Sequence, residues 1–386
     1  MRILLVGEYS RLHNSLKEGL EKIGHDVFLL SRGDGFKNYP SDYSIRNVIL
    51  SDRPIPLFIR KTLRKLFHFD IAKIEIGIRF LLFFYFHRKK KYDIVQLINI
   101  NPIGTFIWLE KIFISLLKNN SDKIFLLSCG DEYINIKYAL DRKIRYSILT
   151  PYLNNEISNN EYYKTYQFVL MYVTPPFVKL HNFVFNKING VIPTDMDYAI
   201  PLTNHIKNKG LIPNPINTDK LHNKKINIEY PIVIFHGINR DTAVKKGNIY
   251  FTKALERLNR LYKGKIQIIE TFSIPYDEYI KAYDSCHILL DQVYSFDMGY
   301  NALEAMAKGK VVFSGWEKET RNQYKLDYVP AINALPDIEY LYKQLEYLIL
   351  NPHKVEEISN NAKRFIDEYH NYINIAKRYC STWTKE

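Results

Sequence analysis

Short apolar runs alternate with helical patterns along this chain, and the alternation has one clear break. The runs before the break have the length and composition of strands that a parallel sheet buries on both faces: Ile3–Val6, Asp26–Leu30, Asp93–Ile98 and Lys123–Ser128. Between the first two runs, Leu12, Leu16 and Leu20 recur at helical spacing, and Gly24 stands where a helix C-cap is expected. Strands that alternate with helices predict an α/β fold.

The break is the segment Ile212–Asp219, which is rich in proline and asparagine and is typical of a linker. The alternation then starts again, with strand-like runs at Ile232–His236, Ile266–Ile269, His287–Asp291 and Val311–Ser314. With 386 residues, the chain has the length for two α/β domains. We predict two doubly wound, Rossmann-like domains at 1–205 and 206–365 that face each other across a cleft, and a helix at 366–386 that returns to the first domain.

The apolar runs and the cysteines argue against export, membrane spans and a bound metal. Met1–Gly7 is too short an apolar run for a signal peptide, and Phe80–Phe86 falls well below the ~20 residues that cross a bilayer. The three cysteines, Cys129, Cys286 and Cys380, lack the spacing of metal ligands. We therefore expect a protein of the reducing cytoplasm that needs no metal and no cofactor.

The formal net charge is +13, and the segment 57–91 holds ten of the basic residues, interleaved with phenylalanines and leucines. This mixture suits the surface of an anionic membrane. A pair of amphipathic helices with solvated cations and buried phenylalanines explains it equally well. No helix-turn-helix, zinc finger or aromatic RNA-binding motif accompanies the charge, so nucleic acid is not an expected partner.

The most informative segment of the second half is a loop followed by a helix near residue 300. A buried run leads to a loop that ends at Gly299, and the helix is expected to start with Tyr300, Asn301 and Ala302. Unpaired backbone amides and the positive end of a helix dipole suit a diphosphate. Glu304, one turn further on, is placed to accept hydrogen bonds from a ribose, and a solvent-facing glutamate is the alternative.

This segment resembles the donor-binding region of retaining glycosyltransferases of the GT-B fold, the group 1 or family 4-like enzymes. Their signature is a glutamate, seven residues, a second glutamate and a small-residue helix followed by Gly-x-Pro-Val. Leu303–Val312 fits it, except that Val311 replaces the proline, and Glu304 falls on the second glutamate, which implies a ribose contact. Phe296 occupies the place of the first glutamate. Either Asp297 takes that role through a shifted loop, or the sugar is positioned differently.

A second match lies upstream, in Phe235–Arg240 and Lys245–Gly247. In the family, a cation after the glycine strand and a later Lys-Gly pair clamp the donor pyrophosphate. The resemblance implies that Arg240, Lys246 and Gly247 hold the diphosphate, where two cations stabilise the leaving group without a metal. Two exposed cations in a charged loop are the alternative interpretation.

The first domain departs further from the family. Gly7 stands alone where the family usually shows paired glycines after the first strand. Leu127–Asp131 resembles the family's His-Gly-Ser-Asp loop that faces the cleft, without its histidine, and Asp131 is a candidate to orient or deprotonate the acceptor hydroxyl. His13 is a second catalytic candidate. A loop-capping aspartate and a structural histidine are the alternatives.

One motif points to a different fold. Asp195-Met-Asp197 matches the metal-binding Asp-x-Asp of the other major glycosyltransferase fold. There the motif belongs to a single nucleotide-binding domain, whereas here it lies near the end of the first domain. We therefore predict a turn or a helix start at this position.

The resemblance as a whole implies a hexosyltransferase that moves a sugar from a nucleotide-sugar donor to a glycan or lipid-linked acceptor, with retention at the anomeric carbon. The expected pathway is surface polysaccharide biosynthesis, of capsule or lipopolysaccharide type. The expected location is the cytoplasm, with peripheral attachment to the inner face of the membrane. Two alternatives stay open: a nucleotide-sugar epimerase of the same fold, and a non-catalytic subunit that only binds a nucleotide-sugar or glycan.

Overall fold

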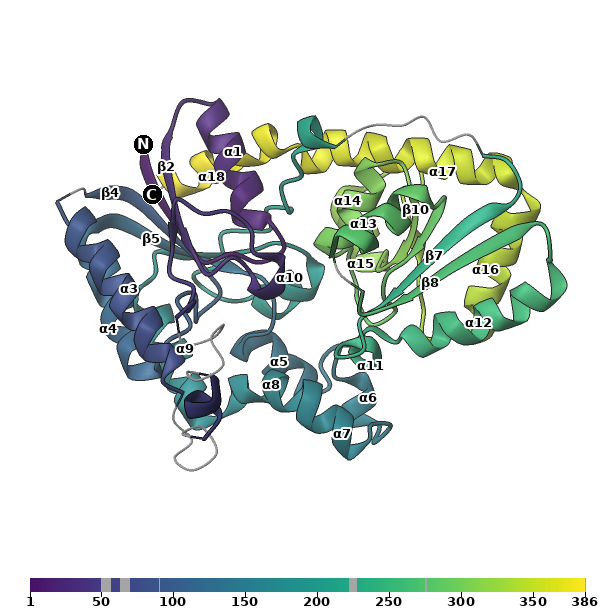
Figure 1. The fold of residues 1–386 in the computed structure, drawn as a ribbon. Helices are drawn as coiled ribbons and strands as arrows, with labels where there is room; N and C mark the ends of the chain where they lie inside the picture. The colour runs from purple at the N-terminus through teal and green to yellow at the C-terminus, as the bar shows by residue number, and fades with distance from the viewer. Residues whose placement is uncertain (50–56, 63–69, 90, 222–227, 275, 386) are drawn as a thin grey trace.

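The computed structural model describes residues 1–386 except 50–56, 63–69, 90, 222–227, 275 and 386. The described chain forms one six-stranded sheet from its first half and one five-stranded sheet from its second half, and the strand pairs of both sheets are parallel. The two sheets and their helices form two lobes that lie side by side (Figure 1). The predicted α/β class with two parallel sheets is confirmed.

The first sheet has the strand order β3-β2-β1-β4-β5-β6. Its strands are β1 (Arg2–Val6), β2 (Asp26–Ser31), β3 (Tyr43–Ser44), β4 (Tyr92–Ile98), β5 (Ser121–Ser128) and β6 (Gly190–Pro193). The order reverses direction between β1 and β4, and open parallel sheets bind ligands at such a switch point, outside the carboxyl ends of the strands.

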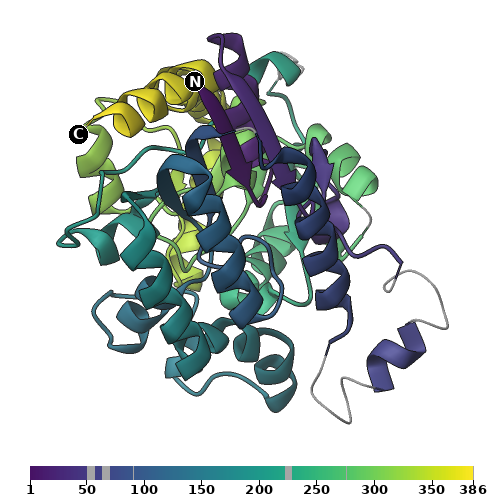
Figure 2. The same ribbon diagram turned by 90° about the vertical axis from the view of Figure 1, so that its left-hand side faces the viewer.

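Helices cover both faces of the first sheet (Figures 1 and 2). The elements between its strands are α1 (Leu12–Lys22), the short η1 (Gly35–Lys37), α3 (Ala72–His87) and α4 (Ile107–Asn119). The connection from β5 to β6 is longer and carries α5 (Tyr133–Leu140), α6 (Thr150–Leu153), α7 (Asn159–Glu161), η2 (Tyr162–Tyr166), α8 (Gln167–Leu170), η3 (Met171–Val173) and α9 (Pro175–Lys187). After β6, α10 (Met196–Leu202) ends this half. Phe80 of α3, Phe113 of α4 and Val184 of α9 are buried in one core against the sheet.

The second sheet has the order β11-β10-β9-β7-β8, with its switch point between β7 and β9. Its strands are β7 (Ile232–Ile238), β8 (Ile266–Phe272), β9 (Ile288–Leu290), β10 (Val311–Ser314) and β11 (Ile332–Asn333). The helices of this half are η4 (Thr218–Lys220), α11 (Ala243–Lys246), α12 (Asn248–Leu261), α13 (Tyr276–Ser285), α14 (Tyr300–Ala307), α15 (Lys318–Tyr324), α16 (Ile338–Leu350) and α17 (Pro352–Phe365).

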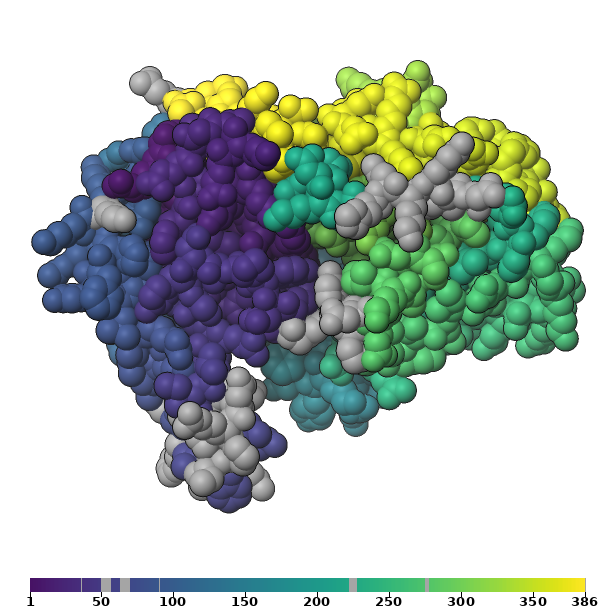
Figure 3. Space-filling model, turned by 45° about the horizontal axis from the view of Figure 1, so that its top comes forward, coloured from purple at the N-terminus to yellow at the C-terminus, as the bar shows by residue number. Residues whose placement is uncertain are grey.

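The C-terminal segment leads back from the second lobe to the first. After α17, the π-helical turn η5 (Ile366–His370) leads into α18 (Tyr372–Thr384), and Figure 3 shows this C-terminal stretch, in yellow, lying across both lobes. On α18, Ile375, Ala376 and Trp383 are buried in a core that also contains Leu16 and Leu20 of α1. The apolar contact between the two helices therefore anchors the end of the chain on the first sheet.

The two chain crossings between the lobes are hydrogen-bonded to each other. The backbone N–H of Ile216 donates to the carbonyl of His370 at 2.8 Å, and the N–H of Tyr372 donates to the carbonyl of Ile216 at 3.3 Å. The buried ring of His370 lies with Nδ1 2.8 Å from the carbonyl oxygen of Asn214. The proline-rich segment is therefore paired with the returning chain, and it does not lie free on the surface.

Within the described residues, no individual helix combines the length and the apolarity needed to cross a bilayer. One bent pair, Asn159–Val173 with Pro175–Lys187, meets the criteria of length and composition jointly, across a bend of 50°.

Gly19 offers a test of how closely α18 packs on α1. A Cβ atom at Gly19 would lie 2.3 Å from the carbonyl oxygen of Tyr372, so a methyl group there must displace α18. Alanine favours a helix over glycine by about 1 kcal/mol, yet we expect the Gly19→Ala variant to lose about 1–2 kcal/mol of unfolding free energy because of the overpacking. Thermal unfolding measures the change. Lys22→Ala, at an exposed site on the same helix, should stay within about 0.5 kcal/mol of the wild type. A Gly19→Ala midpoint at or above that of the wild type contradicts the close contact.

Candidate functional site

Lys246 and the start of α14 lie together at the switch point of the second sheet. Lys246 is the last residue of α11, and its Nζ lies 3.0 Å from Oδ1 of Asp291, which directly follows β9. The Oγ of Ser314 donates to the other carboxylate oxygen of Asp291 at 3.1 Å. A Cβ atom on Gly299 would lie 4.0 Å from that same oxygen. An ammonium group is therefore held beside the N-cap of α14.

The first turn of α14 leaves its amides without a side-chain cap. Gly299 is the N-cap residue, with extended backbone angles (φ −72°, ψ 167°), and no side chain of the cap accepts from the turn. Ala302 is buried, whereas Asn301 is half-buried and its side-chain oxygen lies 3.4 Å from the hydroxyl of Tyr279. Uncapped amides at the positive end of a helix dipole form an anion site that needs no further side chain.

Gly247 positions Lys246. It adopts a left-handed backbone (φ +70°) between α11 and α12, and a Cβ atom there would lie 2.3 Å from Cγ2 of Val293. The N–H of Val293 donates to the carbonyl of Lys246 at 3.0 Å. Only glycine fits both the backbone angle and this close approach. Its role is therefore to bring Lys246 to the loop that precedes α14.

Tyr300 ties the first turn of α14 to the other lobe. Its hydroxyl lies 2.7 Å from the Oγ of Ser15 on α1. Arg11, the residue before α1, donates from Nη1 to the same Ser15 oxygen at 2.9 Å and pairs through Nη2 with Glu18 at 2.7 Å. The starts of α1 and α14 therefore meet, and each helix start lies at the switch point of its own sheet.

Glu304 lies one turn into α14 and faces cations from the first lobe. Burial raises the pKa of Glu304, and the positive charges of Arg11, Lys308 and Lys37 counteract that rise. Arg11 reaches this place because its backbone is left-handed (φ +69°), an uncommon conformation for a residue with a side chain. Sequence alone does not identify Arg11 or Lys37 as site residues, since nothing in the local pattern shows that they lie near Glu304.

The structure does not bring Arg240 into this group. Arg240 is exposed after β7, and its guanidinium lies over the ring of Phe272, 5.7 Å from the ring centroid. Its backbone N–H donates to the Oγ of Ser273 at 3.0 Å. The described residues give Arg240 no ion pair. To reach an anion at the start of α14, its side chain must leave Phe272.

Glu8 fills the amide end of α1, next to the lone Gly7. Its carboxylate accepts hydrogen bonds from the backbone N–H groups of His13 (3.3 Å) and Asn14 (2.9 Å) and from the side-chain amide of Asn14 (2.6 Å). Burial raises the pKa of Glu8 to about 7, although these donors act in the opposite direction. Where the family usually has a second glycine, this chain supplies an acid of its own to the helix start.

Asp131 lies at the domain interface, as its motif predicts. It comes after β5, and its Oδ2 lies 3.6 Å from the Nζ of Lys245 in α11 of the other lobe. Asn99, in a left-handed conformation after β4 (φ +65°), donates from Nδ2 to the carbonyl of Asp131 at 2.8 Å. The half-buried carboxylate of Asp131 therefore faces helix α11, which carries Lys246.

His13 lies inside the first lobe and does not reach the molecular surface. Its ring is fully buried, with Nδ1 2.8 Å from the carbonyl of Gly7 and Nε2 3.3 Å from the amide nitrogen of Gln96. A proton on Nδ1 satisfies both contacts, and burial lowers the pKa of His13 to about 4. The prediction that His13 is catalytic is therefore corrected: the neutral ring braces the Gly7 loop and does not reach a ligand.

The Asp195-Met-Asp197 segment starts a helix, as predicted, and also joins the lobes. Asp195 is the N-cap of α10 and accepts from the N–H of Asp197 at 3.0 Å. The carboxylate of Asp197 in turn accepts from the Oγ of Ser295 (2.6 Å) and from the N–H of Phe296 (3.0 Å). In the reverse direction, the N–H of Met196 donates to the carboxylate of Asp297 at 3.1 Å. We call this reciprocal contact between residues 195–197 and 295–297 the interlobe clasp.

The side chains of Phe296 and Asp297 both make contacts between the two lobes. Phe296 is buried, with the ring of Tyr146 at 5.1 Å and the guanidinium of Arg145 at 4.5 Å from its ring centroid. Arg145 and Tyr146 also hydrogen-bond Glu317, so this contact packs the first lobe on the second. Asp297 is buried in the clasp, where burial raises its pKa to about 7. Neither residue presents a free carboxylate at the place of the family's first glutamate.

In the part of the chain that the structure describes, no group of three or more histidines, cysteines and carboxylates is placed to hold a metal ion.

Residues 250–381 match a family model described as glycosyl transferase-like. No curated protein matches the chain. Among solved structures, the chain resembles sucrose-phosphate synthase from Thermosynechococcus elongatus (14% identity, 99% of this chain and 98% of that one, TM-score 0.59). It also resembles HepE from Anabaena in complex with UDP-glucose (11%, 99% and 99%, TM-score 0.56) and a putative UDP-N-acetylglucosamine 2-epimerase from Listeria monocytogenes (8%, 99% and 94%, TM-score 0.53).

The fold is therefore GT-B, as the sequence predicts. The matched stretch 250–381 contains the loop before α14 and Glu304, whereas Arg11, Asp131 and Lys246 lie outside it. The family match therefore says nothing about Arg11, Asp131 and Lys246, and only the structure shows their contacts.

The clasp gives a prediction about the arrangement of the lobes. Asp197→Ala removes the acceptor that Ser295, Phe296 and Asp297 share and leaves the N–H of Phe296 without a partner, and we expect a loss of about 1–3 kcal/mol of stability. The lobes should also separate, which small-angle X-ray scattering detects as a larger radius of gyration. Asp337→Ala removes an exposed carboxylate that caps α16 within one lobe, so it should lower stability by less and leave the radius unchanged. An unchanged radius in Asp197→Ala contradicts the role of the clasp.

Glu8 gives a prediction about pH. Its pKa is about 4.5 in the unfolded chain and about 7 in the fold, so between these values the folded protein holds a proton that the unfolded chain releases. The stability that Glu8 contributes is therefore fully present below about pH 4.5 and is lost as the pH rises to about 7, by up to roughly 3 kcal/mol. Glu8→Gln should flatten the pH dependence by that amount, as measured by urea unfolding from pH 4.5 to 8, while the buried carboxyls of Glu110, Glu132 and Asp297, with pKa values also about 7, keep the remaining slope. Glu21→Gln, an exposed site on α1, should follow the wild-type curve. A Glu8→Gln variant with the wild-type slope refutes the assignment.

Proposed function

We propose that this chain is a glycosyltransferase that takes a sugar from a nucleotide-sugar donor. The observation that carries the proposal is the convergence of Lys246, the uncapped start of α14 and Glu304 where the switch points of the two sheets meet. A diphosphate needs cations and amide donors, and the ribose beside it needs a hydrogen-bond acceptor one helical turn away. In this proposal the diphosphate is bound by Lys246 and by the helix start at Gly299, Tyr300, Asn301 and Ala302. The ribose is bound by Glu304.

In this proposal, catalysis comes from leaving-group stabilisation. As the bond to the sugar breaks, negative charge grows on the departing nucleoside diphosphate. The ammonium of Lys246 and the amides of α14 are already oriented toward that place, so little reorganisation is needed. Asp291 holds Lys246 in the absence of donor, and the phosphate must compete with that carboxylate. Arg240 joins as a mobile second cation, and no metal is assigned a role.

The acceptor enters from the first lobe. Asp131 lies across the interface from Lys245, where its carboxylate is placed to orient or deprotonate an acceptor hydroxyl. We propose retention at the anomeric carbon and an acceptor that is a glycan or a lipid-linked oligosaccharide, as in assembly of capsule or lipopolysaccharide at the inner face of the membrane. The resemblance of the Leu303–Val312 motif to retaining enzymes supports the stereochemistry.

Nucleotide-sugar epimerisation is the second candidate, since a putative UDP-N-acetylglucosamine 2-epimerase shares the fold. An epimerase needs acid and base groups that converge on the sugar. Two of the interface carboxylates, those of Asp197 and Asp297, are instead committed to backbone donors of the clasp, which favours transfer.

Calorimetry with UDP tests the donor site, because HepE was solved with UDP-glucose. We expect Lys246→Ala to weaken binding by more than ten-fold, since a hydrogen bond to a charged group contributes about 1.5–3 kcal/mol. Arg240→Ala should weaken binding less, because that side chain must first leave Phe272. Lys253→Ala, an exposed cation on α12, is the matched control. Unchanged affinity in Lys246→Ala refutes the phosphate site.

Product analysis tests the reaction. Slow release of UDP from a UDP-sugar without an acceptor indicates a transferase, and NMR of the released sugar reports its anomeric configuration. Conversion of the intact UDP-sugar into an epimer indicates the second candidate. Binding without any turnover, with all plausible acceptors supplied, indicates a non-catalytic subunit.

A further inference from the structure

Helix α3 turns an apolar face to solvent as well as to the core. Its inner side buries Ile76, Phe80 and Phe83 against the first sheet. Its outer side exposes a second set of large apolar residues: Ile74, Ile78, Leu81, Leu82, Tyr85 and Phe86. Steps of three and four residues place this second set on one side of the helix. A surface helix needs only one apolar side to join a core, and the outer set joins none of the cores that the described residues form.

Helix α4 extends this surface. The two helices are neighbours: the rings of Phe80 and Phe113 stack at 4.3 Å, and Figure 2 shows α3 and α4 side by side on the face of the first lobe that turns toward the viewer. On α4, Trp108 and Ile112 are exposed and lie one turn apart. We call the exposed residues of both helices the α3–α4 apolar face.

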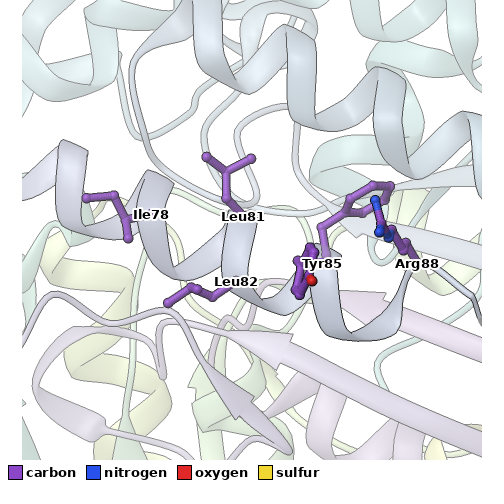
Figure 4. Close-up of a pocket in the computed structure, with 6 residues that line it drawn as sticks. Ile78, Leu81, Leu82, Tyr85 and Arg88 are labelled. Atoms are coloured by element: carbon purple, nitrogen blue, oxygen red, sulfur yellow. The ribbon is translucent and has the colours of Figure 1, made fainter.

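A shallow hollow of about 380 Å³ lies on this face, lined by Ile78, Leu81, Leu82, Phe84, Tyr85 and Arg88 (Figure 4). Its walls are almost entirely hydrocarbon and aromatic. The guanidinium of Arg88 lies at one end, over the ring of Tyr85 at 4.9 Å from the centroid. A hollow with apolar walls and one terminal cation matches the chemistry of a lipid, which has an apolar chain and an anionic head.

The charged groups around the face are mostly cationic. Arg88 and Lys89 are exposed at the end of α3, and Lys111 and Lys118 are half-exposed on α4. The nearby acids are neutralised or buried. Glu75 pairs with Arg79 at 2.9 Å, Asp122 pairs with Lys91, and Glu110 is buried, where it accepts from backbone N–H groups.

We propose that the α3–α4 apolar face docks on an anionic lipid bilayer. With 16 residues, α3 is about 24 Å long, which is shorter than the ~30 Å hydrocarbon core, so the helix lies in the interface. Cations at the headgroups and aromatic rings at the boundary favour this position. The basic, phenylalanine-rich segment 57–91 from which the sequence predicts a membrane surface also includes 63–69 and 90, which lie outside the described residues.

Charge decides between a bilayer and a second copy of this chain. In a two-fold dimer the same patch meets itself, so the cations at the end of α3 and along α4 face like charges. An anionic surface instead neutralises them, and it attracts each nearby lysine or arginine. Figures 1 and 2 place the second lobe on the opposite side of the first sheet from α3 and α4, so docking leaves the donor site in water. Docking would bring the chain to a lipid-linked acceptor only if the proposed function holds. The docking itself does not depend on the proposed function.

Vesicle flotation with the full chain tests the proposal. We expect binding to vesicles of phosphatidylcholine with phosphatidylglycerol, weaker binding to phosphatidylcholine alone, and loss of binding as salt rises. Replacing two exposed apolar residues, Ile78→Ser with Leu82→Ser, should lower the partition coefficient at least ten-fold. Replacing two cations, Arg88→Ser with Lys89→Ser, should lower it about 25-fold.

Matched variants on α12 of the other lobe control for general effects. Ile249→Ser replaces a side chain that is 56% exposed, against 53% for Ile78, and Lys253→Ser with Arg260→Ser replaces two exposed cations. These variants should bind vesicles as the wild type does. All variants should bind UDP with the affinity of the wild type. A variant that loses vesicle binding but keeps UDP binding therefore reports on docking, not on the donor site.

Two results overturn the proposal. In one, the α3 variants float as well as the wild type. In the other, the wild type does not float but sediments as a dimer that Ile78→Ser with Leu82→Ser converts to a monomer, which assigns the face to a second copy of the chain.

Discussion

The interlobe clasp is the contact on which the rest of this structure depends. A buried carboxylate without donors is costly, and the clasp offsets that cost by giving Asp197 the hydroxyl of Ser295 and the N–H of Phe296 while Asp297 receives the N–H of Met196. Hydrogen bonds require donor and acceptor near 3 Å and in line. The clasp therefore sets the position of one lobe on the other more narrowly than apolar packing alone.

The proposed donor site depends directly on that position. Gly299, the N-cap of α14, follows Asp297 by two residues, so the clasp fixes the start of the helix against the first lobe. The contact between Tyr300 and Ser15 then brings Arg11 toward Glu304. Neither lobe holds the full set of charges alone, since Lys246 and Glu304 come from one and Arg11 from the other. The full set of charges therefore exists only where the two lobes meet.

The sequence predicts local features well and long-range ones poorly. Strand-like runs, the linker and the glycine before α14 are patterns of neighbouring residues, and the structure contains each of them. Arg11, by contrast, matters because residue 300 lies opposite it, and no periodicity reveals such a contact. The sequence predicts only a turn or a helix start at Asp195–Asp197 and nothing for Glu8, because the partners of these carboxylates depend on how the elements pack. His13 shows the converse: a residue type suited to catalysis lies where burial removes its access.

Helix α3 shows why composition leaves two interpretations of a basic aromatic segment open. The phenylalanines divide between the faces, with Phe80 and Phe83 in the core and Phe86 exposed, so neither interpretation accounts for all of them. Burial against the sheet explains the inner face through the usual apolar gain. Among the described residues, the large apolar side chains of the outer face stay exposed, so that face receives no such gain from them. A partner that docks there must also tolerate the positive charge of Arg88 beside it.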